Sequence, residues 1–439
     1  MIDVTRAVIA EPHYRTTMLA NSLTVSSFPM PWLHEVGAVL LVRAGSRYEA
    51  EQEAGMAHFL EHMLFKGTDQ IADPGLLHAY LESMAANMNA STGPEYNLYW
   101  ITLPPEYLDE GFLTFCSMFT APAFAHIEVE RQVVIAEMRE DENERGEITV
   151  PNLLAGHKLW PGHPLARSVL GQRETIQRMR VADLRRFLER CYCGCNTALA
   201  FFGPVEHQSV VALSQQALGH WPTGELNQSP EPPAMADGPH WIAVDDPTAQ
   251  LTLTLFFRAD GFRSPLFLPL SALRRLLDDG FSSRLQATVR EQQGLVYHIW
   301  SAYTAFSDAG SFEIGASVAP ENLTQLFAEL MHHCQLLCHT APDADEWQRL
   351  LTRWYSSLRT SLDHPLDLIE RYVSDHLFQA VEPLSVSWEQ VRQLQPQQLL
   401  PIARQILCPS RLVTVLVGPQ ATSLLDGLKQ QLDQLGTAN

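Results

Sequence analysis

The sequence has little positive charge. Thirty lysines and arginines stand against 50 aspartates and glutamates, which gives a formal net charge of −20 at pH 7. No basic cluster is long enough to follow a phosphate backbone, so nucleic acid and anionic membranes are not expected partners. The sequence also lacks an apolar run of membrane-spanning length, and residues 1–21 lack the apolar core of a signal peptide. We therefore expect a cytoplasmic protein without membrane contact.

Cysteine is also scarce. The chain has seven in 439 residues, an odd number that argues against a secreted disulfide framework. Three of them alternate within residues 191–195, which predicts one face of a strand and differs from the C-x-x-C spacing of structural zinc sites. Two more lie at i and i+4 in the histidine-rich segment 332–339, on a predicted helix. We interpret that segment as buried thiols beside exposed histidines, because short metal-like motifs are often false positives.

The chain is long enough for more than one core, since it is 46% hydrophobic and single cores stop growing at about 250 to 300 residues. Residues 34–45 and 249–260 both predict a strand and share an Arg-Ala pair at an offset of 215. Residues 197–204 and 412–419 are both apolar strands that end in Gly-Pro at the same offset. Two independent matches at one offset predict a tandem duplication.

Between the two copies, residues 223–240 are rich in proline, glycine and polar side chains and show no periodicity, which predicts a linker. We therefore expect a first domain at residues 1–222 and a second at residues 241–439. Within each copy, strands alternate with helical stretches such as 50–65 and 181–190. This pattern predicts α+β domains, each with one mostly antiparallel sheet covered by helices.

The chemistry is concentrated in residues 51–68 (EQEAGMAHFLEHMLFKGT). On a predicted helix, His58 and His62 lie one turn apart on the same face, with Glu61 near that face. Two imidazoles suit zinc, and H-x-x-E-H is the inverted form of a zinc-hydrolase motif. The apolar flanks favour this interpretation over a solvated helix, because a buried run does not hold two histidines and a glutamate without partners. Glu61 is a candidate base, and a third ligand must come from elsewhere.

Residues 127–147 offer carboxylates for that role and predict one long helix. Glu130 and Glu137 are seven residues apart, so both lie on one face and can point at the same site. The other acids of the segment are typical of a solvated face. The buried side of the helix is predicted to contain Val129, Val133, Ala136 and Met138. Glu137 is expected to point inward, because Ala136 and Met138 flank it.

The second copy is expected to have lost the metal. At the offset of 215, the positions of His58, Glu61 and His62 are taken by leucines, and a threonine takes the position of Glu137. The four replacements are Leu273, Leu276, Leu277 and Thr352.

These motifs resemble the inverted-motif zinc peptidases, the pitrilysin and insulinase family that includes insulin-degrading enzyme and the mitochondrial processing peptidase. The resemblance covers nearly the whole chain and rests on residues 58–62, 64–68 and 89–92 and on the Glu130–Glu137 spacing. It implies that one Zn²⁺ per chain is bound by His58, His62 and Glu137. It further implies that Glu61 activates water and that Glu130 orients a histidine ligand. The same resemblance implies two similar domains with sheets of about six strands each.

The resemblance also implies a strand that binds substrate. By residues alone, 87–99 predict a hairpin between two strands. The family match implies an edge strand that pairs with an extended peptide, main chain to main chain. That strand would consist of Asn89, Ala90, Ser91 and Thr92. Relatives usually carry two glycines where this chain has alanines at residues 85–86.

A second substrate contact is implied in the second copy, at Arg290 and Tyr297. By residues alone these are a surface arginine and a tyrosine in a loop. In the family, an arginine and a tyrosine at this spacing grip the substrate, where they could donate hydrogen bonds to the scissile carbonyl or its oxyanion.

We therefore expect a zinc-dependent endopeptidase that hydrolyses peptides or leader sequences in a chamber closed by two chains. The resemblance implies that Arg290 and Tyr297 act on the zinc site of the opposite chain. A homodimer is the simpler arrangement, and a heterodimer with a zinc-free partner of the same family is the alternative. Three rival functions are a non-catalytic partner subunit, a structural subunit like the respiratory-complex core proteins, and a zinc hydrolase of non-peptide amides. The intact zinc motif argues against the first two.

Overall fold

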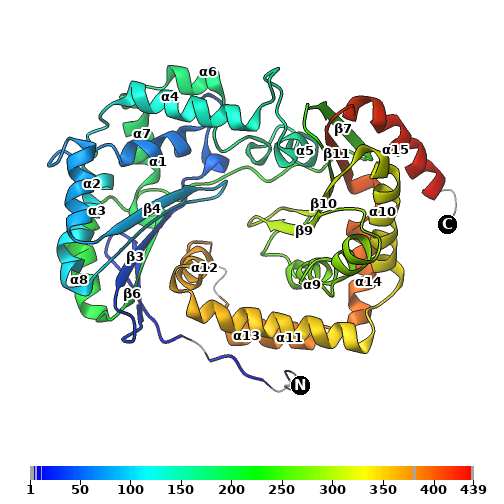
Figure 1. Cartoon of the computed structure of the whole chain (residues 1–439). Coiled ribbons are helices and arrows are strands. Elements are labelled where there is room, and N and C mark those ends of the chain that lie inside the picture. The colour runs from blue at the N-terminus through cyan, green and yellow to red at the C-terminus, as the bar shows by residue number, and fades with distance from the viewer. Residues whose placement is uncertain (1–3, 5–6, 11, 379–381, 437–439) are drawn as a thin grey trace.

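The computed structural model describes residues 4, 7–10, 12–378 and 382–436. Each half of the chain forms one sheet with helices on one of its faces, and the two halves lie side by side in a curved arrangement (Figure 1). This is the two-domain α+β fold that the sequence predicts. Among the described residues, no helix is both long and apolar enough to cross a membrane.

The first sheet has six strands in the order β1-β2-β6-β3-β5-β4. Its neighbouring strands run antiparallel, except that β2 and β6 are parallel. The strands are β1 (Arg15–Met18), β2 (Thr24–Pro29), β3 (Val36–Val42), β4 (Asn87–Thr92), β5 (Asn97–Leu103) and β6 (Thr197–Gly203). Strand β4, which contains residues 89–92, is an edge of the sheet.

The helices of the first half cover one face of this sheet, and the side chains of the central strand β3 alternate between this face and the opposite one. Val36, Ala38 and Leu40 pack under the helices of the first half, whereas Val39 and Leu41 join the core of the second half. The covering helices are α1 (Met56–Leu64), α2 (Pro74–Ser83), α3 (Leu108–Thr120), α4 (Ile127–Met138), α6 (Arg173–Arg178), α7 (Val181–Cys191) and α8 (His207–Leu218).

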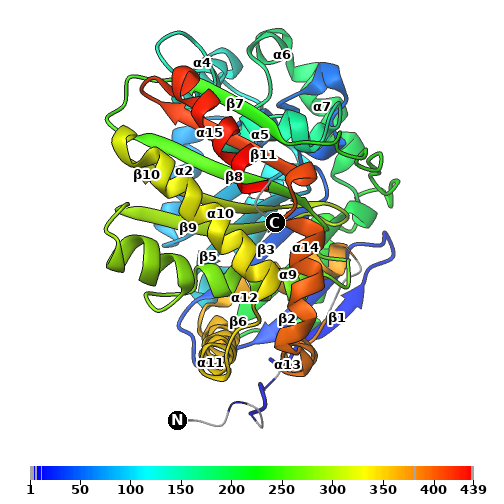
Figure 2. The same ribbon diagram turned by 90° about the vertical axis from the view of Figure 1, so that its right-hand side faces the viewer.

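The second sheet has five strands in the order β7-β11-β8-β10-β9, and only β7 and β11 are parallel. The strands are β7 (His240–Asp245), β8 (Leu251–Ala259), β9 (His298–Ala305), β10 (Gly310–Val318) and β11 (Leu412–Gly418). Its half also contains a π-helix (Gln286–Gln292) and the helices α9 (Phe267–Leu277), α10 (Leu323–His339), α11 (Ala344–Thr360), α12 (Pro365–Leu377), α13 (Leu384–Gln393), α14 (Leu399–Ile406) and α15 (Ala421–Gly436). Figure 2 shows α10, α14 and α15 on the outer face of this sheet.

The two halves repeat one topology. Strands β6 and β11 begin 215 residues apart, at Thr197 and Leu412, and helices α3 and α10 begin at the same offset. In the first sheet β6 is paired in parallel with β2, and in the second sheet β11 is paired in parallel with β7. The order β2-β6-β3-β5-β4 of the first sheet corresponds to the order β7-β11-β8-β10-β9 of the second. The duplication predicted from two short sequence matches is confirmed across the fold.

One pair of equivalent helices is exchanged between the halves. Helix α5 (Pro151–Leu159) of the first half packs on the free face of the second sheet, against β11. Helix α12, its counterpart at the offset of 215, packs on the free face of the first sheet, against β3 and β6. Figure 1 shows each of these helices beside the opposite sheet. Each half therefore completes the core of the other.

A buried ion pair also joins the halves. The Arg47 guanidinium is 2.8 Å from the Glu95 carboxylate and 2.6 Å from that of Asp308, and Glu95 accepts hydrogen bonds from the backbone and hydroxyl of Ser307. Between the halves, residues 219–239 contain no helix or strand. The boundaries at residues 222 and 241 stay predictions.

Several element predictions are wrong in detail. The helix predicted over residues 127–147 ends at Met138, and its buried side contains Glu130, Val134 and Ile135. Val129 and Val133 are 63% and 46% exposed, because the buried stripe of the helix lies one position further along than predicted. Met138 is buried, as predicted. The alternating cysteines 191–195 lie at the end of α7 and in a 3-10 turn, not on a strand.

Candidate metal centre and active site

Helix α1 begins abruptly because its N-terminus is held from two sides. Gly55 adopts a φ of 91°, a left-handed conformation that glycine reaches without strain. The buried carboxylate of Glu49 accepts the backbone N–H groups of Gly55 and Ala57, which would otherwise be unpaired at the helix start. Burial raises the pKa of Glu49 to about 8, although the two N–H groups oppose the shift. The residue before His58 is thus fixed by a hydrogen bond.

Three side chains converge beside α1. His58 and His62 come from α1, and Glu137 comes from the last turn of α4. Their ligand atoms all lie within 4.8 Å of one another. The two histidine Nε2 atoms are 3.2 Å apart, and the Glu137 Oε2 atom lies 3.7 Å from His58 and 3.6 Å from His62. The described residues contain no other group of this kind.

These separations fit zinc. Ligand atoms at 2.0–2.1 Å from a tetrahedral zinc are about 3.3 Å apart, close to the values here. A third ligand supplied by a carboxylate leaves a fourth position open, as in catalytic zinc sites. Two imidazole nitrogens and one carboxylate oxygen are a donor set that a catalytic zinc ion uses. The roles of His58, His62 and Glu137 as metal ligands stay predictions.

Glu130 holds the ring of His62 in the orientation that ligation needs. Its Oε1 atom is 2.8 Å from His62 Nδ1, so the proton of a neutral imidazole resides on Nδ1 and the Nε2 lone pair faces the other ligands. The ammonium group of Lys66 lies 2.7 Å from the second oxygen of Glu130 and holds that carboxylate in place. Glu130 is buried on α4 and does not itself belong to the ligand group.

His58 is kept neutral by its surroundings. Burial, and then the nearby His62, lower the pKa of His58 to about 3. Its Nδ1 atom is buried and has no hydrogen-bond partner among the described protein atoms. A neutral imidazole has a lone pair on one ring nitrogen, and Nε2 is the nitrogen of His58 that faces His62 and Glu137, where a metal ion would bind.

Glu61 lies beside the ligand group without joining it. Its Oε2 atom accepts a hydrogen bond of 2.5 Å from the hydroxyl of Thr92, which in turn accepts one of 2.7 Å from the side chain of Asn97. Burial raises the pKa of Glu61, and the Thr92 hydrogen bond opposes that shift. A carboxylate with a raised pKa next to a metal position is suited to accept a proton and return it.

Strand β4 lies next to this carboxylate. Its side chains alternate between exposed and half-buried, and Thr92 is on the half-buried side that contacts Glu61. Strand β5 pairs with one edge of β4, and no strand of the described residues pairs with its other edge. The main chain of residues 89–91 therefore lies at a free sheet edge. The pairing of Asn89, Ala90 and Ser91 with an extended peptide stays a prediction.

Arg290 and Tyr297 lie in the second half, at the π-helix and in the loop before β9. The Arg290 guanidinium lies over the rings of Tyr297 and Phe281, at 5.7 and 5.5 Å from the centroids. Tyr297 is 84% exposed and Phe281 is 73% exposed. Among the described residues, no hydrogen bond or ion pair joins Arg290 or Tyr297 to the metal group of the same chain. The role of the pair in binding substrate stays a prediction.

Some of the site was not predicted. The capping role of Glu49 is local to the start of α1. The Lys66 ion pair and the contacts of Thr92 and Asn97 depend on how α1 packs against α4 and the β4–β5 hairpin. Only Glu49 left a signal in the sequence, as a carboxylate six residues before a glycine at the start of a predicted helix. The histidines and cysteines of residues 332–339 lie on α10, where His333, Cys334 and Cys338 are buried.

Comparison with known proteins agrees with this geometry. Residues 31–173 match the insulinase (peptidase family M16) model, and residues 178–353 match the peptidase M16 inactive domain. An uncharacterized zinc protease from Mycobacterium bovis is 31% identical over 328 residues, which are 72% of both chains. A probable mitochondrial-processing peptidase subunit beta from Schizosaccharomyces pombe is 27% identical over 74% of this chain and 73% of that protein.

The fold agrees as well. The crystal structure of a protease from Helicobacter pylori superimposes with a TM-score of 0.84 at 22% identity, over 93% of this chain and 100% of the other. The match of the second half to an inactive domain fits the buried leucines at the positions equivalent to the metal group. The chain belongs to the peptidase M16, or insulinase, family.

Proposed function

We propose that this protein is a zinc-dependent endopeptidase. The observation that supports this most is the convergence of His58, His62 and Glu137 within 4.8 Å, with the carboxylate of Glu61 beside them. The names of its relatives as zinc proteases support the same activity. Zn²⁺ held by these three residues would lower the pKa of a water toward neutrality and polarise the scissile carbonyl.

The side chains supply the remaining chemistry. Glu61 accepts the proton of the attacking water, holds it in a buried position and delivers it to the departing amine. Thr92 fixes the orientation of Glu61 from the adjacent strand. Glu130 keeps His62 in its ligating tautomer. Strand β4 positions the peptide through main-chain hydrogen bonds, which makes binding largely independent of side-chain sequence.

The first test replaces Glu61 by glutamine, which keeps the shape of the side chain and removes its basicity. We expect the wild type to bind about one zinc per chain and to cleave a quenched peptide library. Glu61→Gln should bind the same amount of zinc and lose about 10²–10⁴-fold in kcat. Glu51→Gln, at an exposed glutamate before α1, is the matched control and should keep full activity.

Two outcomes contradict the proposal. Equal cleavage by Glu61→Gln at matched zinc content would remove Glu61 from the chemistry. Zinc binding by a wild type that cleaves nothing would favour a subunit that requires a different partner chain for activity.

We further propose that two copies of the chain close around the substrate and that Arg290 and Tyr297 act on the zinc site of the partner. The exposure of Tyr297 and Phe281 supports this arrangement, because large apolar rings left in solvent are typical of interaction sites. Arg290 and Tyr297 would then donate hydrogen bonds to the oxyanion that forms in the opposite chain.

Mixing two inactive variants tests this arrangement. Glu61→Gln lacks the base, and Arg290→Ala lacks the donor, so each homodimer should be poorly active. If subunits exchange, a mixed dimer contains one complete site, and an equal mixture should regain about a quarter of wild-type activity. No recovery after demonstrated exchange, or full activity of a monomer, would contradict action on the partner site.

A further inference from the structure

Three arginines gather between helices α9 and α11 of the second half. Arg274 and Arg275 come from α9, and Arg353 comes from α11. These two helices are the counterparts of α1 and α4, the helices that carry the metal group in the first half. The positions equivalent to the ligands in α9 are the buried leucines Leu273 and Leu277, so this helix pair has no metal group and presents guanidinium groups instead.

One carboxylate forms ion pairs with two of the three arginines. Asp279 is 2.6 Å from Arg275 and 3.2 Å from Arg353. The Arg275 guanidinium also lies 4.9 Å from the ring centroid of Trp354 and donates to the hydroxyl of Ser357. The Trp354 ring and the Asp279 ion pair hold Arg275 in a fixed orientation.

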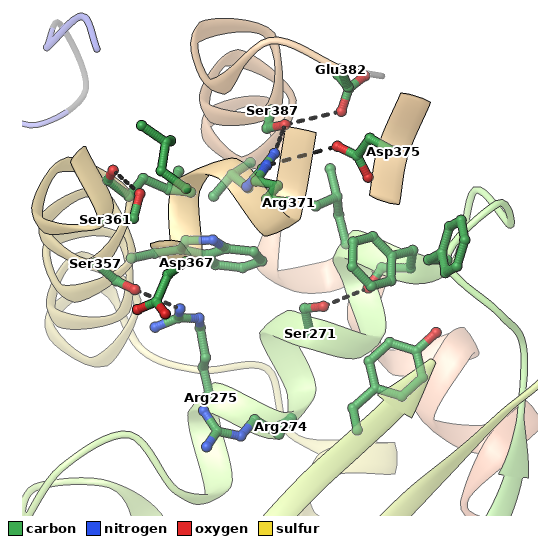
Figure 3. A pocket seen from close by; sticks show the side chains of 18 of the residues that line it. Ser271, Arg274, Arg275, Ser357, Ser361, Asp367, Arg371, Asp375, Glu382 and Ser387 are labelled. Carbon is green, nitrogen blue, oxygen red and sulfur yellow. Dashed lines mark hydrogen bonds and ion pairs between the residues drawn. The ribbon is translucent and has the colours of Figure 1, made fainter. Parts of the chain in front are cut away.

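Arg274 has no carboxylate partner. Its Nε atom donates to the carbonyl oxygen of Ser301 at 3.1 Å, and no acidic side chain within the described part of the chain lies within 4.0 Å of its guanidinium. The amino groups of Arg274 therefore remain available to a ligand. Figure 3 shows Arg274 and Arg275 next to each other, with Ser357 of α11 beside Arg275.

The three arginines line a cavity of about 540 Å³ that is also lined by hydroxyls. The hydroxyl groups belong to Thr352, Ser356, Ser357 and Thr360 on α11. A larger cavity of about 720 Å³ adjoins it and shares Arg274, Arg275 and Ser357. Asp367 of α12 lines that larger cavity, where it makes no ion pair within 4.0 Å in the described structure.

The charge around the smaller cavity is therefore positive in a chain whose net charge is −20. Three guanidinium groups and one carboxylate, that of Asp279, line the smaller cavity. In the adjoining larger cavity, three arginines are matched by three carboxylates, those of Asp367, Asp375 and Glu382. Burial lowers the pKa of Arg275, Asp279 opposes that shift, and the positive charges of Arg274 and Arg353 add to it. An anion in the cavity would offset this repulsion.

We propose that Arg274, Arg275 and Arg353, with the hydroxyls of α11, form a binding site for an oxyanion, either a carboxylate or a phosphate group. A guanidinium donates two parallel N–H groups to such an anion, and hydroxyls donate to its remaining oxygens. The site is separate from the metal group, and its ligand can be a small free anion or the carboxylate of a bound peptide.

Inorganic phosphate is the first probe. Calorimetric titration of the zinc-loaded, full-length protein at constant ionic strength should show saturable binding. Arg353→Gln should weaken this binding at least tenfold, because it removes one charged donor. Arg353 is half-exposed, so its replacement is not expected to disturb the fold. Arg359→Gln, on the same helix but outside the cavity, is the matched control and should bind as the wild type does.

A second variant places an anion in the cavity. Ser356→Glu adds a carboxylate at an exposed lining position and should abolish phosphate binding while raising the melting temperature of the ligand-free protein. Phosphate bound at the zinc would still bind to Arg353→Gln and Ser356→Glu. A loss of phosphate binding in these two variants therefore reports on the arginine site.

A pair of peptides, one with a free C-terminal carboxylate and one with a C-terminal amide, separates the two sources of anion. Tighter binding of the acid form that Arg353→Gln removes assigns the site to a peptide carboxylate. Equal binding of the two peptides, with phosphate binding retained, assigns it to a free phosphate group. The proposal is overturned if the wild type shows no saturable phosphate binding, or if Arg353→Gln binds phosphate as tightly as Arg359→Gln does.

Discussion

The turn between α2 and β4 contains a residue in a strained conformation. Ala85 has a φ of 53°, in the left-handed region that side chains other than glycine rarely occupy. The backbone N–H groups of Ala85 and Ala86 bond to the carbonyl oxygens of Glu82 and Leu81, which is a Schellman cap. Glycine is the usual residue at this position of the cap, so this chain closes the helix at a cost in backbone energy.

Replacing Ala85 by glycine should therefore stabilise the protein. The left-handed conformation costs alanine about 1–2 kcal/mol, and the greater freedom of glycine in the unfolded chain returns part of this. We expect a net gain of roughly 0.5–1 kcal/mol in the free energy of unfolding, measured by urea denaturation. Ala86→Gly is the control, since residue 86 does not have a positive φ, and it should be neutral or destabilising.

The metal-site residues that could be predicted are those related by short sequence spacing. His58 and His62 are one helical turn apart, and Glu130 and Glu137 are two turns apart, so local geometry alone predicts which of them share a face. Contacts that depend on how α1 meets β4 and α4, such as Glu61 with Thr92 and Lys66 with Glu130, could not be predicted in this way. Their partners are 31 and 64 residues away along the chain.

At the scale of elements, the start of α1 depends on a buried carboxylate. Glu49 caps the helix through Gly55 and Ala57, and burial raises its pKa from the ordinary value of 4.5 to about 8. The folded protein therefore binds the Glu49 proton more tightly than the unfolded chain does. The stability that this proton contributes is complete below about pH 4.5 and is lost as the pH rises to about 8.

Glu49→Gln should remove this dependence on pH, because the amide does not ionise. The melting temperature of the zinc-free wild type should fall relative to that of the variant as the pH is raised from 5 to 8. Thermal unfolding in a chelator, followed by circular dichroism at both pH values, measures the difference. A constant difference between the two proteins would mean that Glu49 ionises normally when folded.

The elements themselves could be predicted where the pattern is local. The strands of residues 34–45 and 249–260 alternate clearly and lie in the structure as β3 and β8. The end of α4 could not be predicted, because residues 139–147 include good helix formers. The turn that replaces the helix depends on Asn143, whose side chain accepts the backbone N–H groups of Arg145 and Glu147. Nothing local indicates that α5 and α12 would pack on the opposite sheets.

At the scale of the whole molecule, the halves are joined by the buried network around Arg47. The side chains of Arg47 and Glu95 are 3% and 6% exposed, and Glu95 lies in the turn between β4 and β5. Breaking a buried ion pair leaves one charge without compensation. The network therefore links the substrate strand predicted in the first half to the β9–β10 turn of the second.

Arg47→Met should lower the free energy of unfolding by about 3–5 kcal/mol, because Glu95 is left buried and unpaired. Arg190→Met, which breaks the half-exposed ion pair with Glu53, should cost less than about 1 kcal/mol. Urea denaturation of both variants measures the contrast. Similar losses in the two would mean that the network around Arg47 contributes no more than a surface pair does.

The exchange of α5 and α12 has a consequence for biosynthesis. The free face of the first sheet, with Val39, Leu41 and Phe202, is complete when β6 has been made, but the helix that covers it follows about 160 residues later. At about 5–20 residues per second, a ribosome needs roughly 10 to 30 s to reach that helix. During this interval the nascent chain exposes an apolar sheet face. We therefore expect the emerging polypeptide to engage holdase chaperones until α12 is released from the ribosome.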